Sequence, residues 1–117
     1  MRQEMKLMQK LLKQQKGWQM NYSNKSEKSI EQKLTLTVKK CGGICPKFVS
    51  PGFDGMPDRL VLLPFGKIAF VEVKAPNKKP RPLQKARHGL LQKLGFKVYV
   101  LDDAEQIGGI IDEIRTT

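Results

Sequence analysis

Residues 58–74 read DRLVLLPFGKIAFVEVK, which is two apolar runs separated by the three residues Pro64-Phe65-Gly66. Each run has a length typical of a strand, and the connection carries proline first and glycine last. That order favours a three-residue hairpin loop, a type I turn that ends in a left-handed residue. We therefore predict an antiparallel hairpin with strands over 58–63 and 67–74.

The turn also predicts which side chains of the hairpin meet. If Leu63 faces Lys67, counting outward along both strands places Asp58 opposite Glu72. Opposed residues of an antiparallel pair share one face of the sheet, and side chains alternate along a strand, so Lys74 lies on that face too. A loop shorter or longer by one residue would shift the register and turn Asp58 away from Glu72. The sequence thus predicts two acids and one lysine at one end of the hairpin.

The remaining elements follow from apolar periodicity and from glycine and proline positions. Asn24 and Glu27 resemble a capping pair in front of a first helix. The predicted elements are a helix over 27–40, a short strand over Ile44–Val49, a loop over Ser50–Pro57, the hairpin, a helix from Pro82 to Gly95, a strand over Lys97–Leu101, and a last helix from the pair Asp103 and Gln106 to the C-terminus. The order α-β-β-β-α-β-α predicts an α/β fold with a mixed central sheet of about four strands and helices on both faces.

The helix from Pro82 carries an apolar stripe and, beside it, two polar residues. The stripe consists of Leu83, Ala86, Leu90, Leu91 and Leu94. We expect it to pack on the sheet. Gln84 and His88, four residues apart, lie along the same side of the stripe. His88 is the single histidine of the chain, and a lone histidine beside such a stripe is more often structural than a general base.

The composition indicates one basic domain with a polyanionic partner. The chain has 117 residues, a net charge of +11 and a pI near 9.9. Residues 73–101 contain no aspartate or glutamate. The candidate DNA-binding residues in that stretch are Lys78, Lys79, Arg81, Lys85 and Arg87. We expect a basic N-terminal extension over residues 1–22, which could form a helix, and a single domain over residues 23–117.

Several protein classes are excluded by the pattern. No apolar run approaches the roughly 20 residues of a membrane helix, and no secretory signal precedes the domain. We therefore expect an intracellular protein, cytoplasmic or in the host cytoplasm if the source is viral. Cys41 and Cys45 are too few for a zinc site or a disulfide framework, which favours reduced structural thiols.

Asp58, Glu72 and Lys74 are the residues expected to carry chemistry. The spacing Glu-x-Lys occurs elsewhere in the chain, but only Glu72 and Lys74 end an apolar strand, where charged groups are costly to place. Two carboxylates one strand apart suit Mg²⁺, which prefers oxygen ligands. A metal held there can activate water and polarise a phosphodiester, with Lys74 orienting the water or the phosphate. The alternative is a structural ion pair between Lys74 and one of the acids.

Three segments, taken in their order and spacing, resemble the VRR-NUC nucleases of the PD-(D/E)xK group, which have a restriction-endonuclease-like fold. These segments are Gly55-Met56-Pro57-Asp58-Arg59, Phe70-Val71-Glu72-Val73-Lys74-Ala75 and Pro82-Leu83-Gln84-Lys85. The resemblance runs from about Glu27 to Asp103. It implies a homodimeric endonuclease that depends on Mg²⁺ or Mn²⁺ and hydrolyses DNA, with four-way junctions as the favoured substrate.

The resemblance also implies roles for individual residues. Asp58 and Glu72 correspond to metal ligands, the Val73 carbonyl to a further ligand, and Lys74 to the catalytic lysine. Gln84 corresponds to a glutamine that positions the lysine or the phosphate. A glutamate of the first helix supports the metal in this family. Glu31 is our choice for it, while Glu27, one turn earlier on the same side, stays open.

Two other functions are alternatives to a junction-cutting nuclease. A non-catalytic nucleic-acid-binding module would account for the charge, but it would be expected to supply aromatic stacking platforms. It also leaves the acids and the lysine on one face without a purpose. A nickase or flap nuclease would share the site and differ in the DNA structure that it prefers.

Overall fold

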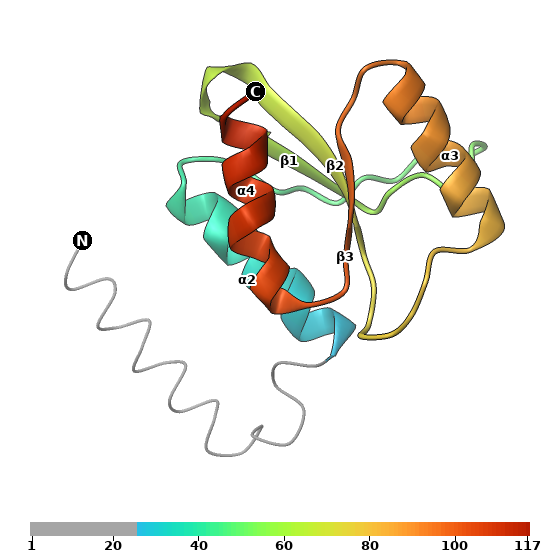
Figure 1. Cartoon of the computed structure of the whole chain (residues 1–117), viewed down its shortest axis with the longest axis horizontal. Coiled ribbons are helices and arrows are strands. Elements are labelled where there is room, and N and C mark those ends of the chain that lie inside the picture. The colour runs from blue at the N-terminus through green and yellow to red at the C-terminus, as the bar shows by residue number, and fades with distance from the viewer. Residues whose placement is uncertain (1–25) are drawn as a thin grey trace.

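The computed structural model describes residues 26–117, and Figure 1 shows their arrangement. The elements in chain order are α2 (Glu27–Lys40), β1 (Arg59–Leu63), the 3-10 turn η1 (Pro64–Gly66), β2 (Lys67–Val73), α3 (Pro82–Lys93), β3 (Val98–Leu101), the 3-10 turn η2 (Ala104–Gln106) and α4 (Ile107–Arg115). The expected extension over 1–22 and the capping residue Asn24 lie outside the described residues. The division at residue 22 therefore stays a prediction.

The described residues form a three-stranded mixed sheet in the order β1-β2-β3. β1 and β2 are antiparallel, and Leu63 pairs with Lys67 as predicted. β2 and β3 are parallel. The turn between β1 and β2 differs in one respect: besides Gly66, with φ +72°, Phe65 adopts a left-handed φ of 67°. Phe65 is 96% exposed at the hairpin tip.

The strand predicted over Ile44–Val49 is wrong as a continuous element. The segment runs antiparallel to β1 and meets it at two isolated bridges, Ile44 with Leu62 and Lys47 with Arg59. Pro46 lies between them: its carbonyl accepts from the Leu60 amide at 3.1 Å, but a proline nitrogen has no hydrogen to return the bond. The ladder is therefore broken, and the sheet has one strand fewer than expected.

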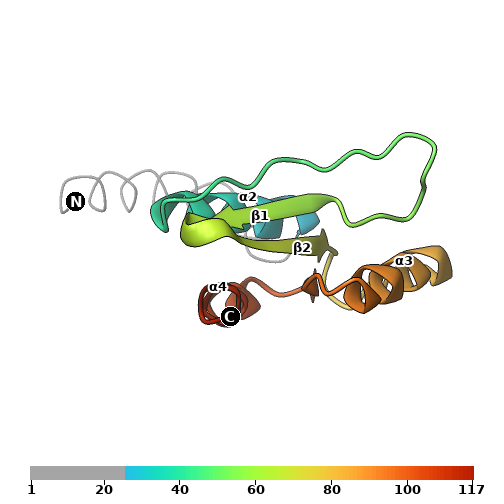
Figure 2. The same ribbon diagram turned by 90° about the horizontal axis from the view of Figure 1, so that it is seen from above.

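The main core lies on one face of the sheet, under α2 and α4. Apolar side chains from alternate positions of β1 and β2 meet those of the two helices there. The cluster comprises Ile30, Leu34, Val38, Val61, Leu63, Ala69, Val71, Val73, Leu101, Ile107, Ile110, Ile111 and Ile114. In both views α3 stands apart from α2 and α4 (Figures 1 and 2). None of its side chains belongs to this cluster, which leaves the second face of the sheet to α3.

Two helix starts differ from the predicted capping pairs. α2 begins after Ser26, whose hydroxyl accepts from the Ser29 amide at 3.0 Å, so the capping box is Ser26 with Ser29. Before α4, Asp103 caps the short η2 turn, and the Gln106 side chain bonds to Asp102. Both predictions placed the helix correctly and chose the wrong partner.

The buried side of α3 also differs from the prediction. Of the five residues of the expected apolar stripe only Leu91 is buried, while Gln84 and His88 are buried beside it. Leu83, Leu90 and Leu94 are 45%, 41% and 65% exposed. The helix is thus rotated so that its polar pair faces the sheet. Among residues 26–117 no helix is long and apolar enough to cross a membrane.

Candidate active site

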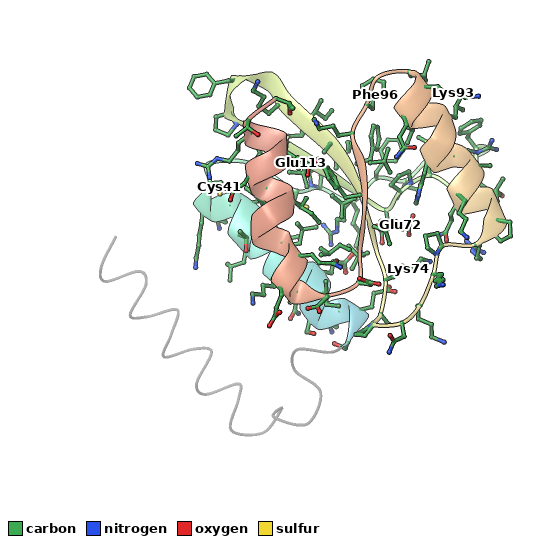
Figure 3. The ribbon with its side chains drawn as sticks, viewed as in Figure 1. Cys41, Glu72, Lys74, Lys93, Phe96 and Glu113 are labelled. Atoms are coloured by element: carbon green, nitrogen blue, oxygen red, sulfur yellow. The ribbon has the colours of Figure 1, made fainter. Side chains whose placement is uncertain are left out.

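Asp58, Glu72 and Lys74 meet on the α3 side of the sheet, as the hairpin register predicts. Asp58 immediately precedes β1, and its Oδ1 accepts a hydrogen bond from the Val73 amide at 3.0 Å. Lys74 follows β2, and its Nζ lies 3.9 Å from Glu72 Oε2. Figure 3 shows Glu72 and Lys74 on the side of the sheet that faces α3. The Asp58 carboxylate therefore fastens the end of β1 to the end of β2, beside the other two charges.

Glu72 is buried, with 3% of its surface exposed, although it is a charged residue. α3 supplies polar neighbours for both of its oxygens. Gln84 Nε2 donates to Oε2 at 3.3 Å, and His88 Nε2 lies 3.5 Å from Oε1. Glu72 Oε1 and His88 Nε2 are both buried and form no hydrogen bond within the described part of the chain. The carboxylate is therefore enclosed on the side of α3.

The electrostatics of the two acids reflect this enclosure. Burial, reinforced by the Asp58 charge, raises the pKa of Glu72 to about 7 against the attraction of Lys74. Burial also raises the pKa of Asp58, and the hydrogen bond from Val73 opposes the shift. Burial and the nearby Lys74 charge lower the pKa of His88. The protein alone thus leaves the negative charge of the pair only partly compensated.

Gln84 connects the start of α3 to the site. Its Oε1 accepts from the Arg81 amide at 2.8 Å, and its Nε2 donates to Glu72. Pro82 occupies the first turn of the helix, where its missing amide hydrogen costs nothing. One side chain therefore caps the helix and holds the acid, which fixes α3 relative to the end of β2.

The structure separates the two glutamates of α2. Glu31 Oε2 pairs with Arg59 Nε at 3.1 Å, and Arg59 Nη1 donates to the Cys45 carbonyl at 2.8 Å. Glu31 raises the pKa of Asp58, whereas Glu27 raises the pKa of both Asp58 and Glu72. The charge of Glu27 is therefore felt by both acids, while that of Glu31 is partly neutralised by a guanidinium.

The basic candidates divide into exposed and engaged side chains. Lys78, Lys79, Arg81 and Lys85 are exposed. Lys78 closes a tight turn in which its amide donates to the Ala75 carbonyl at 3.0 Å, with Asn77 at a left-handed φ of 67°. Arg87 is engaged instead with the loop before β1. Its Nε donates to the Asp54 carbonyl at 2.8 Å, and its guanidinium stacks 3.8 Å from the Phe53 ring centre.

The chemistry of the donors fits a divalent cation, although residues 26–117 contain no ready-made cluster of three acidic, histidine or cysteine ligands. Two carboxylates have raised pKa values, the charge of Asp58 acts on Glu72, and one oxygen of Glu72 has no hydrogen bond within the same residues. Hard oxygen donors with uncompensated negative charge are what Mg²⁺ and Mn²⁺ bind. The lysine at 3.9 Å supplies a cation beside the same acids.

Sequence reasoning treated His88 as structural and did not predict that it lies next to Glu72. The structure places its ring against Glu72, one helical turn beyond Gln84. The signal for this contact is the four-residue spacing, which puts the two polar side chains on one side of the helix.

The VRR-NUC domain model matches residues 2–104, so the match includes most of the segment predicted as an extension. A protein of Acyrthosiphon pisum secondary endosymbiont phage 1 named "Putative nuclease p44" is 57% identical over 79 residues, which cover 68% of this chain and 85% of that protein. A solved VRR-NUC domain superposes with a TM-score of 0.70 at 36% identity, over 74% of this chain and 94% of that one.

Proposed function

The chain belongs to the VRR-NUC family and is a nuclease with a restriction-endonuclease-like fold, and from this premise we propose that it is a metal-dependent DNA endonuclease. The observation that carries the proposal is the convergence of Asp58, Glu72 and Lys74 at one end of the hairpin, with Glu72 buried. A buried carboxylate whose pKa is raised to about 7 destabilises the protein at neutral pH. A function that requires the negative charge of Glu72 explains why a glutamate occupies this buried position.

The proposal assigns a role to each residue of the site. Asp58 and Glu72 hold Mg²⁺ or Mn²⁺, with the Val73 carbonyl as a further ligand. A divalent cation bound there would lower the pKa of a water and neutralise charge on a phosphodiester. Lys74 orients the attacking water or binds the scissile phosphate through its ammonium. Gln84 holds Glu72 through Oε2 and so keeps the acid in place.

The first-helix glutamate that supports the metal is proposed to be Glu27 in preference to Glu31. Glu31 is paired with Arg59, which also ties down the Cys45 carbonyl. The charge of Glu27 raises the pKa of both metal-binding acids, whereas that of Glu31 raises the pKa of Asp58, where its effect exceeds that of Glu27. Glu27→Gln should therefore weaken Mn²⁺ binding more than Glu31→Gln, as measured by calorimetry on the protein without DNA. Stronger weakening by Glu31→Gln would reverse this assignment.

The DNA surface of the proposal is the basic stretch after β2. Lys78, Lys79, Arg81 and Lys85 are exposed there, close in sequence to the site, and Arg81 lowers the pKa of Glu72 through its charge. Basic side chains of this kind neutralise phosphates and give affinity without base preference. Arg87 is assigned to the same surface, with its Nε already bound to the loop.

Junction DNA as the substrate and a homodimer as the active form complete the proposal. One site cuts one strand, so two sites are needed to cut a junction symmetrically. The exposed leucines at 83, 90 and 94 form one stripe of α3 and support a contact with a second copy of the chain. Leu90→Glu together with Leu94→Glu should give a monomer in sedimentation. A wild-type protein that is already monomeric at working concentration would refute the dimer.

The decisive experiment compares labelled four-way junction, flap, nicked and linear duplex DNA in Mg²⁺, Mn²⁺ or EDTA. We expect the junction to be cut in either metal and left intact in EDTA. Preferred cleavage of flaps or nicking of duplexes would keep the site and change the substrate. Binding without cleavage in any metal would instead favour the non-catalytic nucleic-acid-binding module.

The relative from a phage supports action in a host cytoplasm.

A further inference from the structure

We infer that His88 is a positioning residue for Glu72, acting with Gln84 as a two-point holder on α3. Gln84 lies at Oε2 of the carboxylate and His88 lies at Oε1, at 3.3 and 3.5 Å. The inference rests on the proposed function, because it concerns the acid that is proposed to bind the metal. The inference adds His88 to that site, whereas the sequence predicts a structural role for this residue.

Both His88 and Glu72 are buried between α3 and the sheet. His88 is 7% exposed and Glu72 is 3% exposed, so neither side chain can turn to bulk water. Within residues 26–117, His88 Nε2 and Glu72 Oε1 form no hydrogen bond with any atom, and the two lie 3.5 Å from each other. A buried polar atom left without a hydrogen bond destabilises the folded protein. Each atom therefore has the other as its natural partner.

Gln84 and His88 approach Glu72 from the same side of α3. Residues four apart on a helix lie one above the other, so Gln84 and His88 approach the carboxylate from the same element at two heights. The Arg81 amide fixes Gln84 at the start of α3, at 2.8 Å. A carboxylate met at both oxygens cannot rotate about its terminal bond without losing one contact. The lone pairs that α3 does not use therefore keep a fixed direction.

A fixed carboxylate is what a metal site of few ligands requires. Groups that orient a metal ligand commonly change metal affinity by about 10- to 100-fold when they are removed. A histidine that only filled space between α3 and the sheet would be replaceable by any side chain of similar size. The two roles therefore predict different behaviour for a donor and for an apolar replacement at position 88.

The test compares His88→Gln, which keeps a nitrogen donor, with His88→Leu and His88→Phe, which fill the space without one. We expect His88→Gln to bind Mn²⁺ within about threefold of wild type and both apolar variants to bind about tenfold more weakly, in calorimetry without DNA. Melting temperature in EDTA separates this effect from unfolding. Wild-type affinity in a folded apolar variant, or equal loss in His88→Gln, would overturn the inference.

Nuclear magnetic resonance gives a second readout that needs no variant at position 88. His88 is the only histidine of the chain, so its imidazole signals are unambiguous in protein without an affinity tag. We expect Mg²⁺ to shift the Nε2 signal saturably in wild type and not in Glu72→Gln. An Nε2 signal that does not move while calorimetry detects Mg²⁺ contradicts the inference alone. Absence of Mg²⁺ binding by wild type would instead remove the proposed function.

Discussion

The two faces of β2 show what alternate residues of one strand can be used for. Val71 and Val73 point into the apolar cluster under α2 and α4. Glu72, between them, points to the other face, where Gln84 and His88 of α3 receive it. All three side chains are nearly fully buried, with 0%, 1% and 3% exposure. Both faces of β2 are therefore buried. One face buries apolar side chains, and the other buries a carboxylate.

The difference separates the source of stability from the source of function. Burying apolar surface contributes about 25 cal/mol per Å², so the face with the valines stabilises the fold. Burying a carboxylate costs free energy unless it is paired, and the raised pKa of Glu72 reports that cost. The core under α2 and α4 thus supports a site that is unfavourable by itself. Substitutions on one face should change stability, and those on the other should change cleavage.

The largest effect is expected from Lys74→Ala, on the site face. Removing the ammonium beside Glu72 should lower kcat by about 10³-fold or more, since it removes charge stabilisation made only in the transition state. The protein should remain folded at the assay temperature, although loss of the attraction between Lys74 and Glu72 lowers the melting temperature. Lys67→Ala is the matched control, because Lys67 begins the same strand at its far end and, within residues 26–117, its side chain donates to Thr117 O alone. Comparable loss of kcat in both variants would break the comparison.

Leu34→Ala tests the opposite face. Leu34 is fully buried on α2, and its truncation should lower the free energy of unfolding by about 2–5 kcal/mol in urea titrations. Cleavage measured well below the melting temperature should stay within about threefold of wild type, because no contact of the site is lost. A loss of kcat as large as that of Lys74→Ala would show that the two faces are coupled.

The sequence predicted the site face well because its geometry depends on one turn. Pro64 and Gly66 fix the loop length, the loop length fixes the register, and the register brings Asp58 opposite Glu72. No long-range information is needed for that step. The family, the α/β fold and the mixed sheet predicted from the sequence are confirmed.

The errors arise where a tertiary contact outweighs a local pattern. Pro46 breaks a segment whose apolar residues read as a strand, because one missing hydrogen interrupts the ladder. The leucines of α3 read as its buried stripe, yet Gln84 and His88 occupy that position. Burying Glu72 of the facing strand without polar neighbours costs more free energy than burying the leucines of α3 gains. This cost is not visible in the sequence of the helix alone.

The pH dependence of stability gives a second test of the site face. Glu72 titrates near 7 in the folded protein and near 4.5 when unfolded, so its contribution is complete below pH 4.5 and is lost as the pH rises to 7. In EDTA, wild type should therefore lose up to about 3 kcal/mol relative to Glu72→Gln between pH 4.5 and 7.5. Urea unfolding at four pH values measures this. A constant difference between the two proteins would mean that the carboxylate is not strained by burial.

The smallest effect is expected outside both faces, on the exposed turn that follows the site. Lys78→Ala should weaken DNA binding about two- to fivefold and reduce the slope of log K against log salt by about one, as the loss of one phosphate contact predicts. Cleavage at saturating DNA should be unchanged. Lys33→Ala on the outer side of α2 removes the same charge at an exposed position away from the turn. If both variants lower the salt slope equally, the net charge of the chain matters and the location of Lys78 does not.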